Sequence, residues 1–323
     1  MTSSERHEPP ANAHVADESR SSATSDPDAN VSSSTTLKGT ERLLAAWIDR
    51  IGASRGVHQS SGVIRGWLRG RGGLLDLLQT VRQAASLDFL TFDRFHHQHL
   101  IDPRWRSNVR CEPTFPLDPP ADTVLLPLSA TGDAELTRDL LQAAYQTLCD
   151  DGQLWAATDR PADTWLRDEL QRVFKKVSRY ERSGGTVYVA TRTGPLKRIR
   201  DRSATFAFRD PHSPGEPLIH LVSLPGVFSH RKLDVGARAL IEGMHVEAGA
   251  SVVELGCGCG AVSFAAAARA ADVTARAIDT NPRAVLATQL GTTRNDELNL
   301  QRRITVELES ADDVQPAADA RLA

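Results

Sequence analysis

Apolar residues recur along the chain in two kinds of spacing, which together predict strands that alternate with helices. Apolar side chains at helical spacing are typical of amphipathic helices, and short apolar runs between turn residues are typical of buried strands. In the N-terminal part the pattern predicts helices over 41–51, 74–81, 136–150 and 162–177, and strands over 87–92, 123–128, 153–157 and 186–190. Alternating strands and helices indicate βαβ units, so we expect an α/β fold with a mostly parallel sheet.

A second α/β pattern follows a proline-rich stretch, residues 203–227, which we expect to be a connector with one short strand over 218–224. Beyond it the pattern predicts helices over 235–243, 261–270 and 282–294, and strands over 251–255, 273–278 and 304–308. The chain is therefore expected to hold two tandem α/β units, over 37–202 and 228–323.

Residues 1–36 differ from the rest, with nine serines and no aromatic residue. Such a segment cannot bury enough apolar area to offset the entropy of ordering it, so we expect a disordered tail. Its six acids and two bases sum to −4, and because the whole chain carries −3, the remainder carries +1. Any basic surface on the folded part must therefore come from local clustering.

Cysteine content and hydropathy restrict the compartment. Four cysteines in 323 residues give no disulfide framework, which is typical of a reducing environment. No apolar run approaches the roughly 18 residues that span a bilayer, and the N-terminus lacks a signal-peptide pattern. We expect a cytoplasmic protein without a membrane partner.

The clearest motif is a glycine-rich loop between a predicted strand and a predicted helix. Val252–Gly260 reads VVELGCGCG and places Gly256, Gly258 and Gly260 at alternate positions. Glycines there permit tight turns and let a ligand approach the main chain closely. Gly256-x-Gly258-x-x-Ala261 also fits a dinucleotide fingerprint, so a nicotinamide cofactor is one reading of this loop.

Three acids accompany the loop. Glu254 ends the first strand, where a carboxylate suits a cation or amine better than a pyrophosphate, which disfavours the nicotinamide reading. Asp279 ends the next strand, where an acid can accept both ribose hydroxyls of either cofactor class. Asp312 follows the third strand and could accept from an adenine amino group, or it could be a solvated loop residue.

At these residues the sequence resembles the class I S-adenosylmethionine-dependent methyltransferases. Their first motif matches the loop and Glu254, and their second matches Asp279. The segments 225–229 (PGVFS), 233–236 (LDVG) and 279–285 (DTNPRAV) sharpen the resemblance, since they are similar to stretches of the ribosomal RNA guanine-N2 methyltransferases of the RsmC/RlmG type. That resemblance implies two tandem Rossmann-like methyltransferase units, of which the first has lost its cofactor motif and binds RNA and the second is catalytic. It also implies S-adenosylmethionine as cofactor and ribosomal RNA or a ribosomal subunit as partner.

One departure from that family concerns the catalytic segment. Family members carry Asn-Pro-Pro-[Phe/Tyr] after the fourth strand of the catalytic domain, where the Asn side chain and a Pro carbonyl hold the exocyclic amine. No such segment occurs in residues 1–323. We therefore expect the second unit to be incomplete and this chain alone not to be a competent methyltransferase. The alternative function is a non-catalytic RNA-binding protein.

A basic stretch supplies the candidate RNA contact. Residues 167–202 contain eleven bases and four acids, a net charge of +7. We single out Lys175, Lys176, Arg179 and Arg182, because Lys and Arg near phosphates release counterions and strengthen binding. Tyr180 could stack on a base, whereas the plain alternative is a solvated helix face. We predict no metal site, since Cys257 and Cys259 lack a second pair of ligands and fit as small loop residues.

Overall fold

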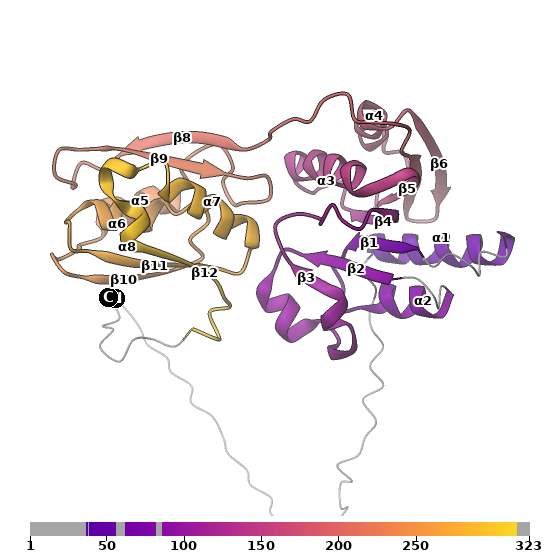
Figure 1. Cartoon of the computed structure of the whole chain (residues 1–323), viewed down its shortest axis with the longest axis horizontal. Helices are drawn as coiled ribbons and strands as arrows, with labels where there is room; N and C mark the ends of the chain where they lie inside the picture. Colours follow the sequence, from indigo (N-terminus) through magenta and orange to yellow (C-terminus); the bar gives the residue numbers. More distant parts are fainter. Residues whose placement is uncertain (1–36, 38, 56–61, 82–85, 315–323) are drawn as a thin grey trace, which may run out of the picture. The chain divides into compact units, whose positions relative to one another are not determined.

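The computed structural model describes residues 37, 39–55, 62–81 and 86–314. It contains a seven-stranded sheet with the order β3-β2-β1-β4-β5-β7-β6, a two-stranded sheet β8-β9 and a three-stranded sheet β10-β11-β12 (Figure 1). We call residues 39–202 the N-terminal unit and residues 204–314 the C-terminal unit. The α/β class predicted from the sequence is confirmed in both.

The large sheet is parallel except at one edge. Its strands are β1 (Val63–Trp67), β2 (Ser86–Thr91), β3 (Val109–Cys111), β4 (Ala121–Leu128), β5 (Leu148–Thr158), β6 (Lys176–Arg182) and β7 (Gly185–Thr191). Strands β3, β2, β1, β4 and β5 pair in parallel, and β7 pairs antiparallel with both β5 and β6. The mostly parallel sheet is therefore confirmed.

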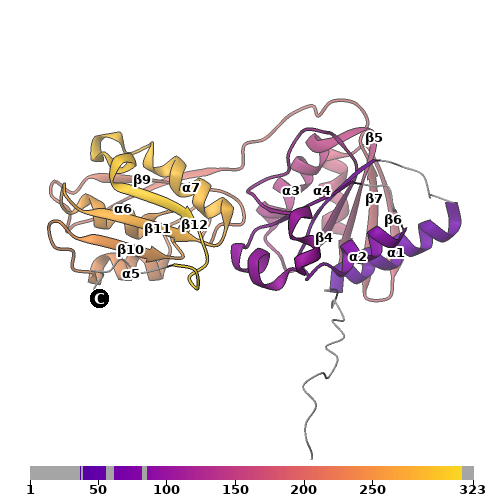
Figure 2. The same cartoon turned by 60° about the horizontal axis from the view of Figure 1, so that its bottom comes forward.

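Helices cover both faces of this sheet (Figures 1 and 2). They are α1 (Gly39–Arg55), α2 (Gly73–Val81), α3 (Ala134–Thr147) and α4 (Thr164–Val173), and the short helices are η1 (His96–Leu100) and η2 (Pro103–Asn108). Leu125 packs in the cluster formed with α1 and α2, whereas its neighbours Val124 and Leu126 pack in the cluster formed with α3 and α4. This alternation follows from the two-residue period of a strand, and it makes β4 the centre of two cores.

The sequence prediction was wrong in the region that carries the basic stretch. Helix α4 ends at Val173, and residues 176–182, expected as the end of a helix and a loop, form the edge strand β6. Both faces of an edge strand of this kind can carry polar side chains, so KVSRYER shows no apolar alternation that would mark a strand. The helix predicted over 136–150 also ends earlier, at Thr147, where β5 begins.

The C-terminal unit agrees more closely with the prediction. Its strands are β8 (Ala204–Arg209), β9 (Leu218–Ser223), β10 (Ser251–Leu255), β11 (Thr274–Asp279) and β12 (Ile304–Leu308). Its helices are α5 (Val235–Gly243), α6 (Ala261–Ala268), α7 (Pro282–Thr292), η3 (Asp296–Leu298) and α8 (Leu300–Arg303). The stretch expected as a connector with one strand holds two, since β8 pairs antiparallel with β9.

The core of the C-terminal unit forms around α6. All residues from Ala261 to Ala267 are buried, and they pack with Phe208 and Leu221 of the β8–β9 hairpin and with Ala277 of β11. In the described part of the chain β10 is an edge strand, and its Val253 and Leu255 are 38% and 56% exposed. The three strands are parallel, so the carboxyl ends of β10 and β11 lie at the same end of the sheet.

Candidate cofactor-binding site

The loop between β10 and α6 adopts a backbone that glycine alone takes without strain. Gly256, Gly258 and Gly260 have φ angles of 76°, 56° and 81°, in the left-handed region that side chains with a Cβ disfavour. The backbone N–H groups of Gly256 and Cys257 both donate to the carbonyl of Ile278, at 2.8 and 3.0 Å. These bonds hold the loop against the end of β11.

The three glycines have different surroundings. A Cβ at Gly260 would meet the Phe264 ring at 2.7 Å and the Thr288 methyl carbon at 2.8 Å, so this glycine allows α6 and α7 to pack closely. A Cβ at Gly256 or Gly258 would meet nothing within 4 Å. The main chain at these two positions is therefore open to the close approach of a ligand.

Asp279 connects the loop to the end of β11. Its Oδ2 accepts from the backbone N–H of Gly258 at 2.9 Å, and its Oδ1 accepts from the N–H of Asn281 at 2.8 Å. A carboxylate has about four acceptor positions, so each oxygen keeps capacity for one further donor. Asp279 can thus fix the loop and accept two ligand hydroxyls.

Glu254 lies half-buried at the end of β10, beside the start of α6. Its Oε2 accepts from the backbone N–H of Ser263 at 2.8 Å and from the Ser263 hydroxyl at 2.5 Å. Burial raises the pKa of Glu254 to about 7; the Ser263 hydrogen bonds oppose this shift and the charge of Asp279 adds to it. A nearby cationic group on a ligand would favour the ionised form.

The structure brings Glu254, the three glycines and Asp279 together, but it places Asp312 differently. Leu308 of β12 pairs in register with Asp279, so Asp312 follows at the same end of the sheet. Its side chain is exposed, and among the described residues only its backbone N–H has a recorded contact, with the Ser310 hydroxyl at 3.4 Å. Its role in binding adenine stays a prediction.

Two other sequence segments also meet at this site. The Asn281 side chain donates to the carbonyl of Gly226 at 3.0 Å, and Arg283 Nη1 donates to the carbonyl of Pro225 at 3.0 Å. Residues 225–229 and 279–285, far apart in the sequence, are thus fastened to one another. Sequence reasoning missed Ser263, although it is the one polar side chain in the helix sequence AVSFAAAA.

Residues 218–317 match the family model described as Methyltransferase small domain. This part of the chain is similar to the methyltransferase small domain family. A methyltransferase family implies S-adenosylmethionine as the methyl donor, and the acids and open glycines described above lie within the matched residues.

One of the similar solved structures supports the fold. A T. thermophilus 16S rRNA N2 G1207 methyltransferase, RsmC, solved with AdoMet and guanosine, is similar with a TM-score of 0.61 and 19% identity, covering 82% of this chain and 69% of that chain. An O-methyltransferase family protein from Burkholderia thailandensis has a TM-score of 0.34 and 15% identity, covering 48% of this chain and 57% of that chain. TrmN from Thermus thermophilus has a TM-score of 0.34 and 16% identity, covering 46% and 48%. No curated protein sequence matches the chain.

The two cysteines of the glycine-rich loop behave as small apolar residues. Cys257 is buried, with its sulfur 3.6 Å from the Thr288 hydroxyl. Burial raises the pKa of the Cys257 thiol, and it raises the pKa of Cys259 to about 11. Both thiols therefore stay protonated at neutral pH. Within the described ranges, no group of three or more His, Cys, Asp or Glu side chains could hold a metal ion, and no helix is long and apolar enough to cross a membrane.

The four basic residues proposed for RNA do not converge on one surface. Lys175 lines a pocket with α3, whereas Lys176 lines a separate pocket with Trp47 and Tyr180. Arg179 forms an ion pair with Glu181. Arg182 lies over the Trp47 ring, 5.5 Å from its centroid. Tyr180 itself packs against Trp47 with ring centroids 4.2 Å apart, so a role in stacking on a base stays a prediction.

The raised pKa of Glu254 predicts a pH-dependent affinity for S-adenosylmethionine. Below about pH 7 the free carboxyl is protonated and must release its proton when a cationic amino group binds, so affinity should fall up to tenfold per pH unit as the pH drops below 7. Above about pH 7 the Glu254 carboxyl is already ionised, so its titration should no longer change the affinity. Calorimetric titration between pH 5.5 and 8.5 measures the slope. The Glu254→Gln variant, which can still accept from Ser263, should lose it; an unchanged slope in that variant would assign the proton to another group.

Proposed function

We propose that this chain is an S-adenosylmethionine-dependent methyltransferase that acts on the N2 amine of a guanine in ribosomal RNA. The observation that carries the proposal is the loop of three positive-φ glycines whose Gly258 N–H is held by Asp279. It combines an open main chain with a carboxylate at the end of the adjacent strand, as a bound nucleoside requires.

The residues present fit the cofactor. Asp279 would accept the two ribose hydroxyls, Glu254 would balance the charge of the amino group, and Gly256 and Gly258 would let the ligand lie against the main chain. The bound cofactor supplies a methyl group already activated by a sulfonium. The task of this chain is therefore to bind and orient the two reactants, which accounts for much of the rate in such reactions.

The N-terminal unit differs from the C-terminal unit at the loop that corresponds to the glycine loop. Its strands β3-β2-β1 repeat the order β12-β11-β10, so the loop after β1 corresponds to the glycine loop after β10. There the carboxylate of Glu41, a residue that is 1% exposed, accepts from the N–H groups of Arg69 and Gly70 at 2.9 and 2.8 Å. The Glu41 carboxylate fills the space against this loop, since a Cβ at Gly70 would meet its Oε2 at 2.3 Å, whereas a Cβ at Gly256 or Gly258 would meet nothing within 4 Å. We infer that this unit has no cofactor role and contributes to RNA binding.

The choice of ribosomal RNA rests on two supports. One is the fold shared with the T. thermophilus 16S rRNA N2 G1207 methyltransferase over 82% of this chain. The other is the contact between segments 225–229 and 279–285, which carry the sequence resemblance to guanine-N2 enzymes.

Methyl transfer is the decisive experiment. Tritiated S-adenosylmethionine is incubated with ribosomal subunits that lack guanine-N2 methylation, and the RNA is digested to nucleosides. We expect label in N2-methylguanosine. Label in another nucleoside would overturn the substrate. RNA binding without methyl transfer would favour the alternative, a non-catalytic RNA-binding protein.

A further inference from the structure

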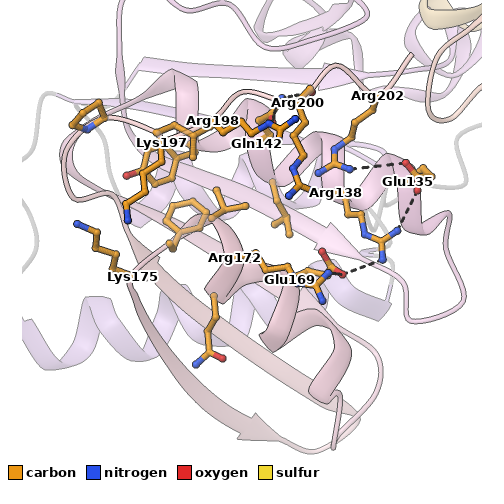
Figure 3. A pocket seen from close by; sticks show the side chains of 17 residues that line it. Glu135, Arg138, Gln142, Glu169, Arg172, Lys175, Lys197, Arg198, Arg200 and Arg202 are labelled. Atoms are coloured by element: carbon orange, nitrogen blue, oxygen red, sulfur yellow. Dashed lines mark hydrogen bonds and ion pairs between the residues drawn. The ribbon is translucent and has the colours of Figure 1, made fainter. Parts of the chain in front are cut away.

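The N-terminal unit contains a second site of interest, a basic pocket (Figure 3). The pocket has a volume of about 650 Å³ and lies between α3, the C-terminal end of α4 and the segment 195–202, which we call the strap. Its charged lining consists of seven cationic side chains, Arg138, Arg172, Lys175, Lys197, Arg198, Arg200 and Arg202, and two acidic ones, Glu135 and Glu169. The net charge of +5 is concentrated on a chain whose total is −3.

The two acids organise the inner part of the pocket. Arg138 bridges them, with its guanidinium 3.2 Å from Glu135 and 3.0 Å from Glu169, and Arg172 lies 2.7 Å from Glu169. Burial opposes ionisation of Glu169, but the hydrogen bond and charge of Arg138, with those of Arg172, keep its pKa below the ordinary value. The two glutamates therefore hold Arg138 and Arg172 in place, and the charges of the two arginines and the two glutamates cancel.

The outer cations have a different environment. Lys175, Lys197, Arg198 and Arg200 are exposed, and no ion pair to them is recorded in the part of the chain that the structure describes. The strap that carries three of them is anchored through its main chain: Arg200 N–H donates to the Gln142 side chain at 2.8 Å, and the Gln142 amide donates to the Arg200 carbonyl at 3.0 Å. The anchor leaves the Arg200 guanidinium available (Figure 3).

The floor of the pocket restricts what can bind. Leu141, Tyr145 and Phe174 are at most 4% exposed, and the two rings pack on each other with centroids 4.9 Å apart. The two aromatic rings that line the pocket in the described part of the chain therefore offer no exposed face on which a base could stack. Binding must therefore rely on the charged side chains at the rim of the pocket. Several adjacent cations suit a ligand with a row of phosphates better than a ligand with one phosphate.

We propose that this pocket binds the phosphodiester backbone of single-stranded RNA, with Lys175 and the strap residues Lys197, Arg198 and Arg200 as the phosphate contacts. The identity of the ligand as RNA rests on the proposed function. Phosphates bind across the rim, the bases point away, and binding is independent of sequence. Of the four bases singled out in the sequence, only Lys175 belongs to this surface.

The test compares two triple variants of the full chain that change charge equally. K197Q/R198Q/R200Q removes three of the strap cations, and R106Q/R160Q/R167Q removes three exposed cations outside the pocket. The probe is a fluorescein-labelled 12-nucleotide oligouridylate, titrated by anisotropy at several salt concentrations without S-adenosylmethionine. Each lost phosphate contact lowers the log–log salt slope by about 0.7. We expect the strap variant to lower the slope by about 2 and the affinity on the order of 100-fold at 0.1 M salt, with little change in the control.

Every other outcome contradicts the proposal. Equal losses in the two variants would mean that general charge attracts the RNA. Displacement of the probe by polyglutamate at matched charge would indicate an acidic protein partner, and displacement by tripolyphosphate at equal phosphate concentration would indicate a free polyphosphate site. In the described part of the chain the side chains of Lys197, Arg198 and Arg200 form no hydrogen bond or ion pair, and the control residues are exposed, so both variants should keep the melting temperature of the parent chain. Methyl transfer is not part of this assay, so failure of the proposed function leaves the result interpretable.

Discussion

Replacing Asp210 by alanine should lower the stability of the C-terminal unit by about 3–5 kcal/mol, the range for breaking a buried ion pair by removing one partner. Asp210 directly follows β8 and is completely buried. Its carboxylate accepts from Arg269 Nε at 3.0 Å, from the Ser213 hydroxyl at 2.8 Å and from the His212 N–H at 3.1 Å. Without it, the Arg269 guanidinium, whose side chain is only 7% exposed, remains buried without its counter-charge.

Urea unfolding of the full chain, followed by fluorescence and circular dichroism, measures this change. Asp272→Ala is the matched control, because Asp272 is an exposed acid in the turn before β11 and its loss changes net charge equally. The control should stay within about 0.5 kcal/mol of the parent, as surface substitutions usually do. A loss below 1 kcal/mol in Asp210→Ala would mean that the ion pair does not fasten the β8–β9 hairpin to α6.

The same substitution should change the response to acid. Burial opposes ionisation of Asp210, but the hydrogen bonds of Arg269, His212 and Ser213 hold its pKa below the ordinary value. A carboxylate with a lowered folded pKa stabilises the protein above its unfolded pKa, and this contribution disappears as the pH falls through the folded pKa. Part of the acid sensitivity of the parent chain should therefore be missing from Asp210→Ala.

The sequence was most informative where elements are short and bounded by turns. The predicted bounds of 251–255 and 304–308 agree with β10 and β12, because a short apolar run between turn residues identifies a strand. Strand β1 was missed because Gly66 looks like part of a glycine-rich turn. A Cβ there would meet the Phe89 ring at 2.4 Å and the Leu125 carbonyl at 3.0 Å, so this glycine is required by close packing within the sheet.

The candidate cofactor site was largely predictable because its parts follow a local rule. Glu254, the glycines and Asp279 occupy the ends of consecutive parallel strands, and such ends meet at one edge of a sheet. The basic pocket could not be derived in the same way. Arg138 of α3 comes together with Arg172 and Arg200 only because the strap crosses α3 and is anchored to Gln142, a contact between residues 58 positions apart. Counting charges in the sequence identified the basic stretch 167–202, but it could not show which of its side chains line the same pocket.

Asp279→Ala should weaken the binding of S-adenosylmethionine at least a hundredfold. Two effects add: the ligand loses two hydrogen bonds to a charged acceptor, each worth about 1.5–3 kcal/mol, and the loop loses the acceptor of the Gly258 N–H. The loss of loop support adds to the first effect because Gly258 is held in a left-handed conformation with open space around it. Few other single changes in this site could remove both ligand contact and loop geometry.

Calorimetric titration of the full chain with S-adenosylmethionine measures the affinity, and urea unfolding of each variant shows whether the fold is kept. Asp272→Ala is again the control, since it removes one acid before the same strand without touching the loop. Asp312→Ala gives a second comparison: its carboxylate is exposed, so even a contact with the adenine amino group should make its loss cost less than that of Asp279. If Asp279→Ala stays folded and binds as tightly as the parent, the ribose does not lie at the end of β11. The glycine loop would then need a different ligand.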